Sequence, residues 1–342
     1  MSDLENRLIP WFQVKKRDLP WRKNVNDYTI YVSEIMLQQT RVETVIPYFN
    51  RFVNTLHSFY ELANVDDELL LKLWEGLGYY SRVKNMKKCA RVIVDEYDGK
   101  FPNNYENALK LPGIGAYTAG AILSRAYQIP LAAIDGNALR VLSRLYEDDS
   151  DISKEATKKA YKEKMEKLIT QPGLFNEALM ELGATICMPK IYLCNECPLK
   201  DICKAYKHNS ISNYPVKLAK VKNTPFEYSV LFITDGINYI LINKKDGVLK
   251  DMVSPILVDR FYNEADIANY VEENLNLNVK NVFHIKDAKH IFSHQTWYMK
   301  GFLVLVDDLK NYPHYTYNEI VEKISLAKAY KKIFESIENV PF

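Results

Sequence analysis

Four cysteines lie close together near the middle of this 342-residue chain. They are Cys187, Cys194, Cys197 and Cys203, in the spacing C-x6-C-x2-C-x5-C. The loops between them are short and can fold back on themselves, so the four thiolates could surround one small metal centre. Four cysteines hold either a structural zinc ion or an iron–sulfur cluster. Zinc sites tend to use paired C-x2-C segments, and only one such pair is present, so the spacing leaves both interpretations open.

The cysteines, the N-terminal sequence and the length of the apolar runs indicate the cellular compartment that we expect for the protein. Two disulfides among the four cysteines are less favoured, because a chain of this length does not need cross-links. The fifth cysteine, Cys89, stands alone in the sequence. The N-terminus lacks a charged start followed by an apolar segment, so no targeting signal is expected. No apolar run has the length of a membrane span. We therefore expect a cytoplasmic protein, associated with the nucleoid in a bacterium, with no membrane partner.

The overall charge does not indicate a nucleic-acid-binding protein. Its net value is only +2, and the hydrophobic content of 47% is ordinary for a globular protein. The charge is nevertheless uneven, because Lys190 to Lys222 contains seven lysines against two acids. That local excess could follow a phosphate backbone, and a solvated linker is the alternative.

The spacing of apolar residues predicts two parts of different character. Helical patterns follow one another from about residue 5 to residue 210, and the stripe over 28–53 fits one helix, or two with a break near 38–41. Two β-rich runs around Asp235–Gly236 predict a hairpin. The further elements expected in the C-terminal part are a helix over 264–275, strands near 280–286, 291–299 and 301–306, and a helical end over 317–336.

These elements predict a multidomain protein. The expected parts are an all-helical region over 1–207, which contains a helical hairpin (104–127) and the cysteine loop (187–203), a linker over 208–225, and a smaller α+β domain over 226–342. The linker is inferred from its polar, basic and proline-punctuated composition.

A glycine-rich turn lies between two helical patterns. Gly113 and Gly115 flank one apolar residue in the run LPGIG (111–115), which permits a tight turn with positive φ angles and close approach of another chain. The next helical pattern begins at once, and the free N–H groups of a helix start bind anions. A DNA phosphate could therefore dock there, with an ordinary helix–helix turn as the alternative.

One acidic residue follows this turn, directly before the next helical segment. Asp135 lies 20 residues after Gly115, after an apolar run and directly before a helical segment. Its side chain could point into a cleft or cap the helix. The two roles are compatible, because a cap fixes the position of the side chain.

Several segments, in this order, resemble those of the MutY-type adenine DNA glycosylases, which belong to the helix-hairpin-helix, iron–sulfur-containing glycosylase superfamily. They are LPWR (19–22), SEIMLQQT (33–40), GLGYYSR (76–82), LPGIGAYTAGAI (111–122), IDGN (134–137) and NEALMELGATIC (176–187). The resemblance implies a 4Fe–4S cluster on the four cysteines. It also implies that the C-terminal domain is Nudix-like and recognises the lesion. The run over 245–255 departs from the family, because the usual Trp and Phe are absent.

The resemblance implies a role for two carboxyl groups. Glu34 should be the general acid that protonates the leaving adenine, and its apolar neighbours in the sequence could raise its pKa by desolvation. Asp135 should stabilise or trap the oxocarbenium-like centre, by analogy with glycoside hydrolysis. The resemblance adds Tyr117 and Asn137 as positioning groups beside Asp135. Without this context, Glu34 would be an ordinary solvated acid of a helix.

The resemblance also implies how DNA is bound. The target base must leave the stack to reach Glu34. The DNA-facing positions implied by the family are Gln39, Thr40 and Tyr79 at the gap, Arg22 and Glu177 around the extruded adenine, Ser293 and His294 (in FSHQTW, 292–297) at 8-oxoguanine, and Gly113 and Gly115 at the backbone. The expected partner is double-stranded DNA that contains adenine:8-oxoguanine mispairs, bound by a monomer.

Together these implications predict a monofunctional adenine DNA glycosylase that initiates base excision repair. The related endonuclease III carries a lysine nucleophile at the position of Tyr117, and without an amine there is no Schiff base. A bifunctional glycosylase and lyase for oxidised pyrimidines is the first alternative. The second is a non-catalytic DNA-binding or redox module, against which the presence of both Glu34 and Asp135 argues.

Overall fold

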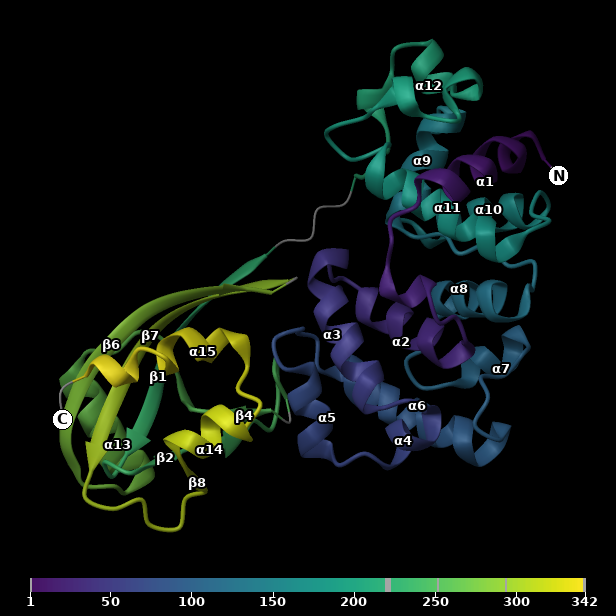
Figure 1. Ribbon diagram of the computed structural model, residues 1–342. Helices are drawn as coiled ribbons and strands as arrows, with labels where there is room; N and C mark the ends of the chain where they lie inside the picture. The colour runs from purple at the N-terminus through teal and green to yellow at the C-terminus, as the bar shows by residue number, and fades with distance from the viewer. Residues whose placement is uncertain (1, 219–222, 251, 293, 341–342) are drawn as a thin grey trace. The chain divides into compact units, whose positions relative to one another are not determined.

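The computed structural model describes residues 2–218, 223–250, 252–292 and 294–340, which form two compact units (Figure 1). The first unit combines Met1–Val65 with Ser81–Lys220, and the second combines Asp66–Tyr80 with Val221–Phe342. Within the described residues, no helix has both the length and the apolar character needed to cross a membrane.

The first unit is helical throughout, as predicted. Its α-helices are α1 (Asp3–Lys15), α2 (Asp27–Leu37), α3 (Val42–Thr55), α4 (Phe59–Asn64), α6 (Ser81–Tyr97), α7 (Tyr105–Lys110), α8 (Ala116–Tyr127), α9 (Gly136–Tyr146), α10 (Glu155–Glu166), α11 (Pro172–Thr185) and α12 (Lys204–Lys207). Short 3-10 turns lie at Pro20–Arg22, Cys194–Glu196, Lys200–Ile202 and Ile211–Asn213. The predicted break near 38–41 is confirmed, because α2 ends at Leu37 and α3 begins at Val42.

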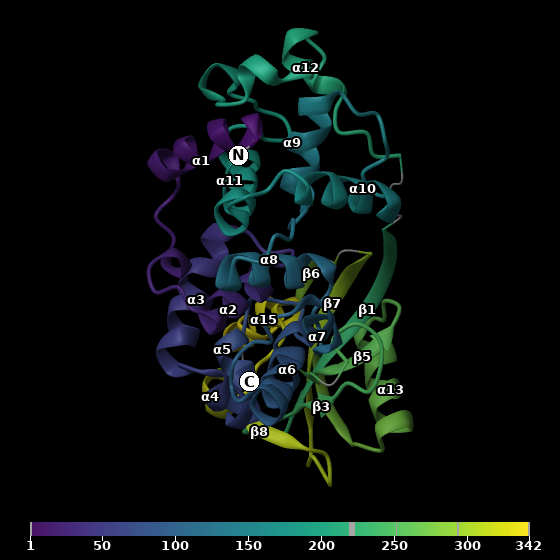
Figure 2. The same ribbon diagram turned by 90° about the vertical axis from the view of Figure 1, so that its right-hand side faces the viewer.

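Helix α11 is the central element of this unit. It packs against α1, α8 and α9, whose neighbouring positions can be followed in Figure 2. Leu8 and Phe12 of α1, Leu142 of α9 and Leu179 of α11 belong to one buried core cluster. Full burial of one apolar side chain of this size stabilises the folded state by about 1.5–3 kcal/mol. The core therefore holds α9 and α11 in a fixed relative position, on which the site described below depends.

The predicted hairpin is formed by α7 and α8. The amide of Ile114 donates to the carbonyl oxygen of Leu111 at 3.2 Å, and Gly113 has a φ of +79°. An added Cβ at Gly113 would lie 3.0 Å from Cβ of Asn85, so this glycine is needed for both conformation and space. Gly115 differs from the expectation of a positive φ. It is the N-cap of α8 with a φ of −99°, and a Cβ there would meet no atom within 4 Å.

The second unit is built on a mixed sheet, in agreement with the predicted α+β character. The strands of the six-stranded sheet are β1 (Thr224–Thr234), β2 (Asn238–Ile240), β5 (Ile256–Asp259), β6 (Val279–Ile291), β7 (Gln295–Val306) and β8 (His314–Thr316), in the order β6-β7-β1-β2-β8 with β5 on β1. β1 and β7 are parallel, and the other pairs are antiparallel. A two-stranded sheet, β3 (Ile242–Asn243) with β4 (Val253–Ser254), and the helices α5 (Asp67–Trp74), α13 (Glu264–Leu275), α14 (Tyr317–Glu322) and α15 (Lys328–Phe334) complete it.

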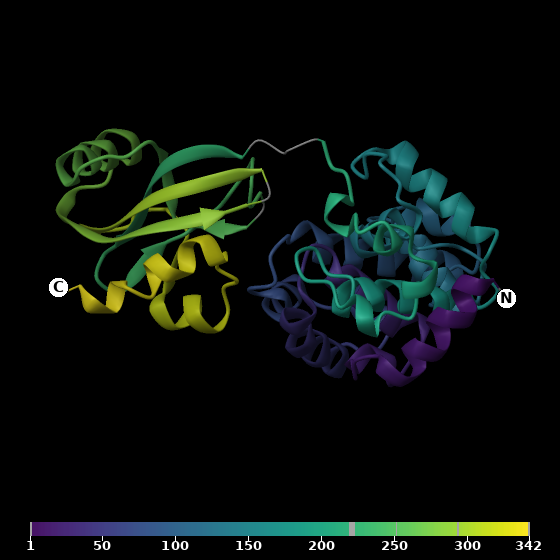
Figure 3. The same ribbon diagram turned by 90° about the horizontal axis from the view of Figure 1, so that it is seen from above.

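Both faces of this sheet are covered by helices. Successive side chains of a strand point to opposite faces. On β7, Trp297 and Leu303 therefore join a core cluster with Ile333 of α15, whereas Phe302 joins a second cluster with Ile267 of α13. In Figure 3 the green helix α13 and the yellow C-terminal helices lie on opposite sides of the sheet.

Local predictions in this unit are mostly confirmed. β1 and β2 form the predicted hairpin, with Gly236 at a φ of +103°, and α13 spans 264–275 as predicted. The predicted helical end divides into α14 and α15. The separate strands predicted at 291–299 and 301–306 are wrong, because β7 runs through Gly301 without a break.

Gly301 lies within the strand for a packing reason. An added Cβ would lie 2.3 Å from Cγ2 of Ile333 and 3.0 Å from the carbonyl oxygen of Lys286. The residue opposite belongs to a register shift of β6 between His284 and Lys286. The glycine therefore lets α15 approach the sheet closely, which is one of the uses of glycine in a strand.

The segment Asp66–Tyr80 belongs to the second unit, although it precedes most of the first unit in sequence. Nζ of Lys72 donates to the carbonyl oxygen of Val321 at 2.8 Å, and Oγ of Ser325 donates to that of Leu71 at 3.3 Å. Nζ of Lys331 lies 3.2 Å from Oε1 of Glu75. Long-range contacts of this kind leave no signal in the local sequence pattern.

Replacement of Gly301 by alanine should destabilise the second unit by about 1–3 kcal/mol, because the new methyl group overlaps Ile333. Chemical unfolding would measure the change. The double variant G301A/I333A should lose less stability than the sum of the two single variants, because I333A removes the overlapping group. An additive result would contradict the packing explanation.

Candidate functional site

The carboxyl group of Glu34 is buried inside the first unit. Its residue is only 8% exposed, on α2. The hydroxyl of Tyr117, in the first turn of α8, donates to Oε2 of Glu34 at 3.3 Å. The same hydroxyl lies 3.3 Å from Sδ of Met180 on α11. Three helices thus converge on one carboxyl group.

The surroundings of Glu34 favour its protonated form. Burial is the largest effect and, with the nearby carboxyl groups of Glu177 and Asp135, raises the pKa of Glu34 to about 7. The positive charge of Arg125 and the hydrogen bond from Tyr117 oppose this shift only in part. A carboxylic acid with this pKa can carry a proton near neutral pH and release it, as a general acid must.

Asp135 is the N-cap of α9, as the sequence predicted. Its Oδ1 accepts from the backbone N–H of Ala138 at 2.7 Å, and its Oδ2 accepts from Nδ2 of Asn137 at 2.8 Å. Burial raises the pKa of Asp135 above its usual range, but these hydrogen bonds oppose the rise. The first turn of α9 also favours negative charge through its unpaired N–H groups. The two carboxyl groups therefore have different surroundings: among the residues that the structure describes, Glu34 accepts one hydrogen bond, from Tyr117, whereas Asp135 accepts hydrogen bonds from both Ala138 and Asn137.

Asn137 is held in turn by Arg140, a residue that the sequence did not single out. Nη2 of Arg140 donates to Oδ1 of Asn137 at 2.8 Å and to the carbonyl oxygen of Gly183 at 2.7 Å. Nε of Arg140 donates to the carbonyl oxygen of Cys187 at 2.8 Å. A chain of hydrogen bonds therefore runs from Asp135 through α9 to the first cysteine. Arg140 lies outside the sequence motifs named above, so only its contacts in the structure single it out.

Gly183 permits the close approach of α11 to α9. An added Cβ would lie 2.6 Å from Cβ of Asn137 and 3.1 Å from its Cα. Sequence inspection did not single out this glycine, although a glycine inside a helical pattern is a signal of close packing.

Two arginines share the carboxylate of Glu177. Nε of Arg22 lies 3.0 Å from Oε1, and Nε of Arg125 lies 3.3 Å from Oε2. The pair Arg22 and Glu177, inferred from the sequence, is therefore brought together, and Arg125 is an addition. Arg22 also donates through Nη2 to Oε2 of Glu181 at 3.1 Å. This is a network of partly buried, charge-assisted hydrogen bonds close to Glu34.

The three residues expected at the gap in the DNA are divided between the units. Gln39 is exposed, with a φ of +56°, in the turn between α2 and α3, and Thr40 follows it. Tyr79 belongs to the second unit, with a φ of +51° and 44% exposure. Both exposed side chains stand on strained backbone, which is a feature of functional turns.

Of the two residues expected at the lesion, His294 directly precedes β7, and Ser293 lies outside the described residues. His294 is exposed, its Nε2 lies 3.0 Å from Nε2 of Gln295, and its carbonyl oxygen accepts from the backbone N–H of Thr224 at 3.1 Å. Phe292 packs edge-on against Trp297 at a centroid distance of 4.8 Å. The structure thus anchors the two aromatic ends of this segment and leaves the His294 side chain at the surface.

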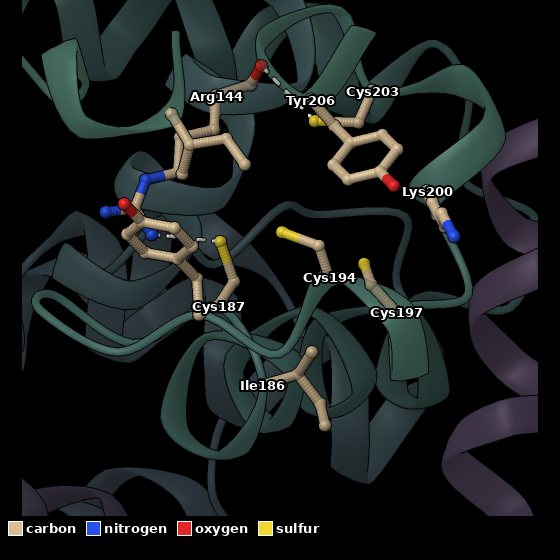
Figure 4. Close-up of a pocket in the computed structure, with 10 residues that line it drawn as sticks. Arg144, Ile186, Cys187, Cys194, Cys197, Lys200, Cys203 and Tyr206 are labelled. Atoms are coloured by element: carbon tan, nitrogen blue, oxygen red, sulfur yellow. Dashed lines mark hydrogen bonds between the residues drawn. The ribbon is translucent and has the colours of Figure 1, made fainter. Parts of the chain in front are cut away.

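The four clustered cysteines line one pocket of the first unit (Figure 4). They are free thiols, so the disulfide alternative has no support. Nη1 of Arg144 donates to Sγ of Cys187 at 3.3 Å, and Sγ of Cys203 lies 3.6 Å from the carbonyl oxygen of Arg144. Tyr192, Lys200 and Tyr206 complete part of the wall.

The donor set of this pocket suits a metal cluster. Burial raises the pKa of the Cys197 thiol to about 12, and it raises those of Cys194 and Cys203 as well. Thiolates would therefore need a strong positive charge among them, as a metal centre supplies. A pocket bordered by four thiols fits a cluster in which each cysteine binds a different iron atom. The fit rests on the residue types and on their shared pocket, because within the described residues no three cysteine, histidine or acidic side chains are arranged to hold a single metal ion.

Comparison with known sequences gives a consistent result. Residues 32–167 match the HhH-GPD family, described as "HhH-GPD superfamily base excision DNA repair protein". The adenine DNA glycosylase of Buchnera aphidicola subsp. Baizongia pistaciae is 34% identical over 307 residues, which cover 88% of this chain and 86% of that protein. That of the subspecies Schizaphis graminum is 33% identical, with 96% of both chains covered. The adenine DNA glycosylase of Rattus norvegicus is 41% identical over 218 residues, 60% of this chain and 42% of the relative.

Solved structures resemble the chain over about three fifths of its length. A thermostable thymine-DNA glycosylase is 28% identical, with a TM-score of 0.54, and the match covers 59% of this chain and 94% of that one. A non-covalent complex of endonuclease III with DNA has a TM-score of 0.50 at 21% identity, over 61% of this chain and 99% of that one, and shows the fold alone.

Replacement of Gly183 by alanine should push Asn137 away and destabilise the first unit by about 1–3 kcal/mol, because α9 and α11 cannot separate without loss of core contacts. Thermal unfolding would measure this. Gly136 is a matched control, since its added Cβ would meet no atom within 4 Å. G136A should cost nothing, because alanine favours a helix over glycine. Equal losses for both variants would argue against the close approach at Gly183.

Proposed function

The chain belongs to the MutY-type adenine DNA glycosylases of the helix-hairpin-helix superfamily, and we propose that it hydrolyses the N-glycosidic bond of adenine paired with 8-oxoguanine or guanine in duplex DNA. This step would initiate base excision repair. The observation that carries the proposal is the buried Glu34, whose pKa is raised to about 7 beside Tyr117. Buried carboxyl groups with a strongly shifted pKa cluster at functional sites.

Glu34 acts as the general acid. Adenine is a poor leaving group as an anion, so a proton must reach the base while the bond to C1′ breaks. The protonated carboxyl group of Glu34 can supply that proton, and the hydroxyl of Tyr117, 3.3 Å away, holds its position. The helices around it exclude water from the carboxyl group, which keeps the pKa near 7.

Asp135 acts on the sugar. Loss of the base leaves positive charge at C1′, and an ionised carboxylate can stabilise this centre or bond to it until water completes the hydrolysis. The hydrogen bonds from Ala138 and Asn137 stabilise the ionised form against the cost of burial. Asn137 and Arg140 thus act by holding Asp135 in place.

The base must be extruded before either carboxyl group can act. Arg22 and Glu177, linked at 3.0 Å, offer donors and acceptors to an extruded adenine near Glu34. The exposed side chains of Gln39 and Tyr79 fill the gap that the base leaves, with Thr40 beside Gln39. The open surface at Gly115 and the turn at Gly113 admit a backbone phosphate to the N–H groups at the start of α8.

The reaction is monofunctional. The side chain at position 117 is a phenol whose pKa burial raises well above its usual range, so it offers no nucleophilic amine. Without an amine no Schiff base forms, and the sugar–phosphate backbone is left uncut.

The four cysteines would hold a 4Fe–4S cluster in the pocket that they line. Bound there, the cluster would supply the positive charge that keeps the partly buried thiolates ionised, and the cysteines would tie the ends of the 187–203 loop together. Arg144 supports the site by donating to Sγ of Cys187 and, through Nη1, to the carbonyl oxygen of Met188 at 2.9 Å. The lysines of this loop can then approach the phosphate backbone.

The second unit recognises the lesion. Its mixed sheet with helices on both faces suits the Nudix-like fold that the family implies. The exposed His294, together with Ser293, reads the N7–H and O8 groups that distinguish 8-oxoguanine from guanine. The segment over 245–255 lacks the Trp and Phe that the family usually carries there.

Adenine release should be faster from a duplex with adenine opposite 8-oxoguanine than from one with adenine opposite guanine. Single-turnover rates for the two duplexes test both the chemistry and the second unit. Equal rates would leave the glycosylase but remove the lesion-reading role. Borohydride should trap no covalent protein–DNA adduct, because Tyr117 replaces the amine. Absence of release from both duplexes would contradict the proposed function.

The single-turnover rate should fall as the pH rises through about 7, because Glu34 is active only while protonated and its pKa is raised to about 7. E34Q should lose about 10²–10⁴-fold in rate together with this pH dependence. E163Q, at an exposed glutamate of α10 near Lys159, is the matched control and should behave like the unmodified protein. A pH profile unchanged by E34Q would remove Glu34 from the mechanism.

The purified protein should contain about four iron atoms and four labile sulfides per chain, since four cysteines coordinate the cluster. C197S should lower the iron content and the thermal stability. C89S is the control, because Cys89 is buried elsewhere and should not affect iron. Stoichiometric zinc instead of iron would restore the zinc interpretation of the cysteine spacing.

A further inference from the structure

Arg82 binds the end of α2 and the turn that follows it. The residue lies on α6 and is only 8% exposed. Its Nη1 donates to the carbonyl oxygens of Ile35 (3.0 Å), Met36 (2.9 Å) and Gln38 (2.5 Å). Its Nη2 donates to Oγ1 of Thr40 at 3.1 Å. One guanidinium group therefore spans the whole turn.

These contacts meet a physical need of the backbone. The last carbonyl groups of a helix have no partner within the helix. A planar guanidinium with several fixed donors can satisfy them and reach a further acceptor, which a lysine ammonium on a flexible chain does less well. Gln39 has a φ of +56°, a conformation that a residue with a side chain holds only where its surroundings impose it.

A second contact links the same turn to α8. Nε2 of Gln38 donates to Oγ1 of Thr118 at 3.2 Å, and Thr118 is adjacent to Tyr117. The turn is thus held from α6 and from α8. Arg82 therefore lies beside both proposed functional positions of this region. Glu34 directly precedes Ile35, the first residue whose carbonyl group Arg82 binds. Gln39 lies between Gln38 and Thr40, which supply the last two acceptors.

We propose that Arg82 is a positioning residue, which holds the 38–40 turn so that Gln39 can enter the gap left by an extruded base. The proposal rests on the proposed function, since the gap exists only if adenine is extruded. Arg82 touches no reacting atom. Its loss should therefore slow base extrusion more than bond cleavage.

The experiment compares R82M and R82K with R91M. Arg91 is the matched control, because it lies on the same helix and donates through Nε to the carbonyl oxygen of Ala63 at 3.2 Å, away from the turn. Single-turnover adenine release would be measured opposite 8-oxoguanine in two duplexes. In one, the flanking base pairs are matched. In the other they are mismatched, which lowers the cost of extrusion.

Both Arg82 variants should lose about tenfold or more in rate on the matched duplex, and much less on the mismatched one, because methionine removes the charge-assisted hydrogen bonds to the turn and a lysine ammonium does not span all of its acceptors. R91M should keep both rates. If R82M does not fold, which thermal unfolding reveals, R82K carries the test.

Hydrogen exchange of the DNA-free protein gives a readout that does not depend on catalysis. Backbone amides over 36–42 should exchange faster in the Arg82 variants than in R91M, while the other helices of the first unit stay unchanged. Unchanged exchange over 36–42, or equal rate losses on the two duplexes, would overturn the proposal. If the unmodified protein releases no adenine at all, the proposed function fails, and the exchange measurement still decides whether Arg82 holds the turn.

Discussion

The partial removal of two carboxyl groups from water within one helical unit, with Glu34 buried and Asp135 partly buried, is the constraint that shapes the rest of the site. Desolvation is the largest effect on the pKa of both Glu34 and Asp135, and an ionised group in such surroundings is costly without partners. The fold treats them differently. Asp135 receives donors from the first turn of α9, whereas Glu34 receives one hydroxyl donor and lies near Arg125. Pairs of carboxyl groups with opposed surroundings are the usual basis for dividing acid and base tasks.

Helix α9 connects this chemistry to the cysteine pocket. Asp135 caps its start, Arg140 bonds to Asn137 and to the backbone of Cys187, and Arg144 donates to the Cys187 thiol. The helix therefore shares its side chains between the carboxyl group at one end and the proposed cluster at the other. A continuous series of hydrogen bonds thus links the backbone of Cys187 to Asp135, and α9 and α11 are closely packed at Gly183.

In the second unit, as in the first, a glycine allows two elements to pack closely together. Gly301 lets α15 pack on a continuous strand, and the helices on both faces bury the sheet. This unit also includes the segment that ends at Tyr80. Tyr79, expected at the DNA gap, is therefore grouped with the proposed lesion-reading sheet, whereas Gln39 is grouped with the carboxyl groups. The proposed recognition of the lesion and the proposed insertion of Tyr79 would therefore belong to one folded unit.

The sequence alone determined the local features, because they depend on neighbouring residues. The helix break near 38–41, the hairpin turn at Asp235–Gly236, the N-cap at Asp135 and the cysteine set all follow from periodicity, turn chemistry and spacing. The motifs and their order along the chain indicated the family, and the family resemblance in turn indicated the expected site residues. Only the tertiary structure decided the rest. The raised pKa of Glu34, the shared contacts of Glu177, the contacts of Arg140 and Arg82 and the unbroken strand through Gly301 arise from residues far apart in the chain. Burial and long-range packing create these properties, and no local pattern encodes which distant side chain will meet which carboxyl group.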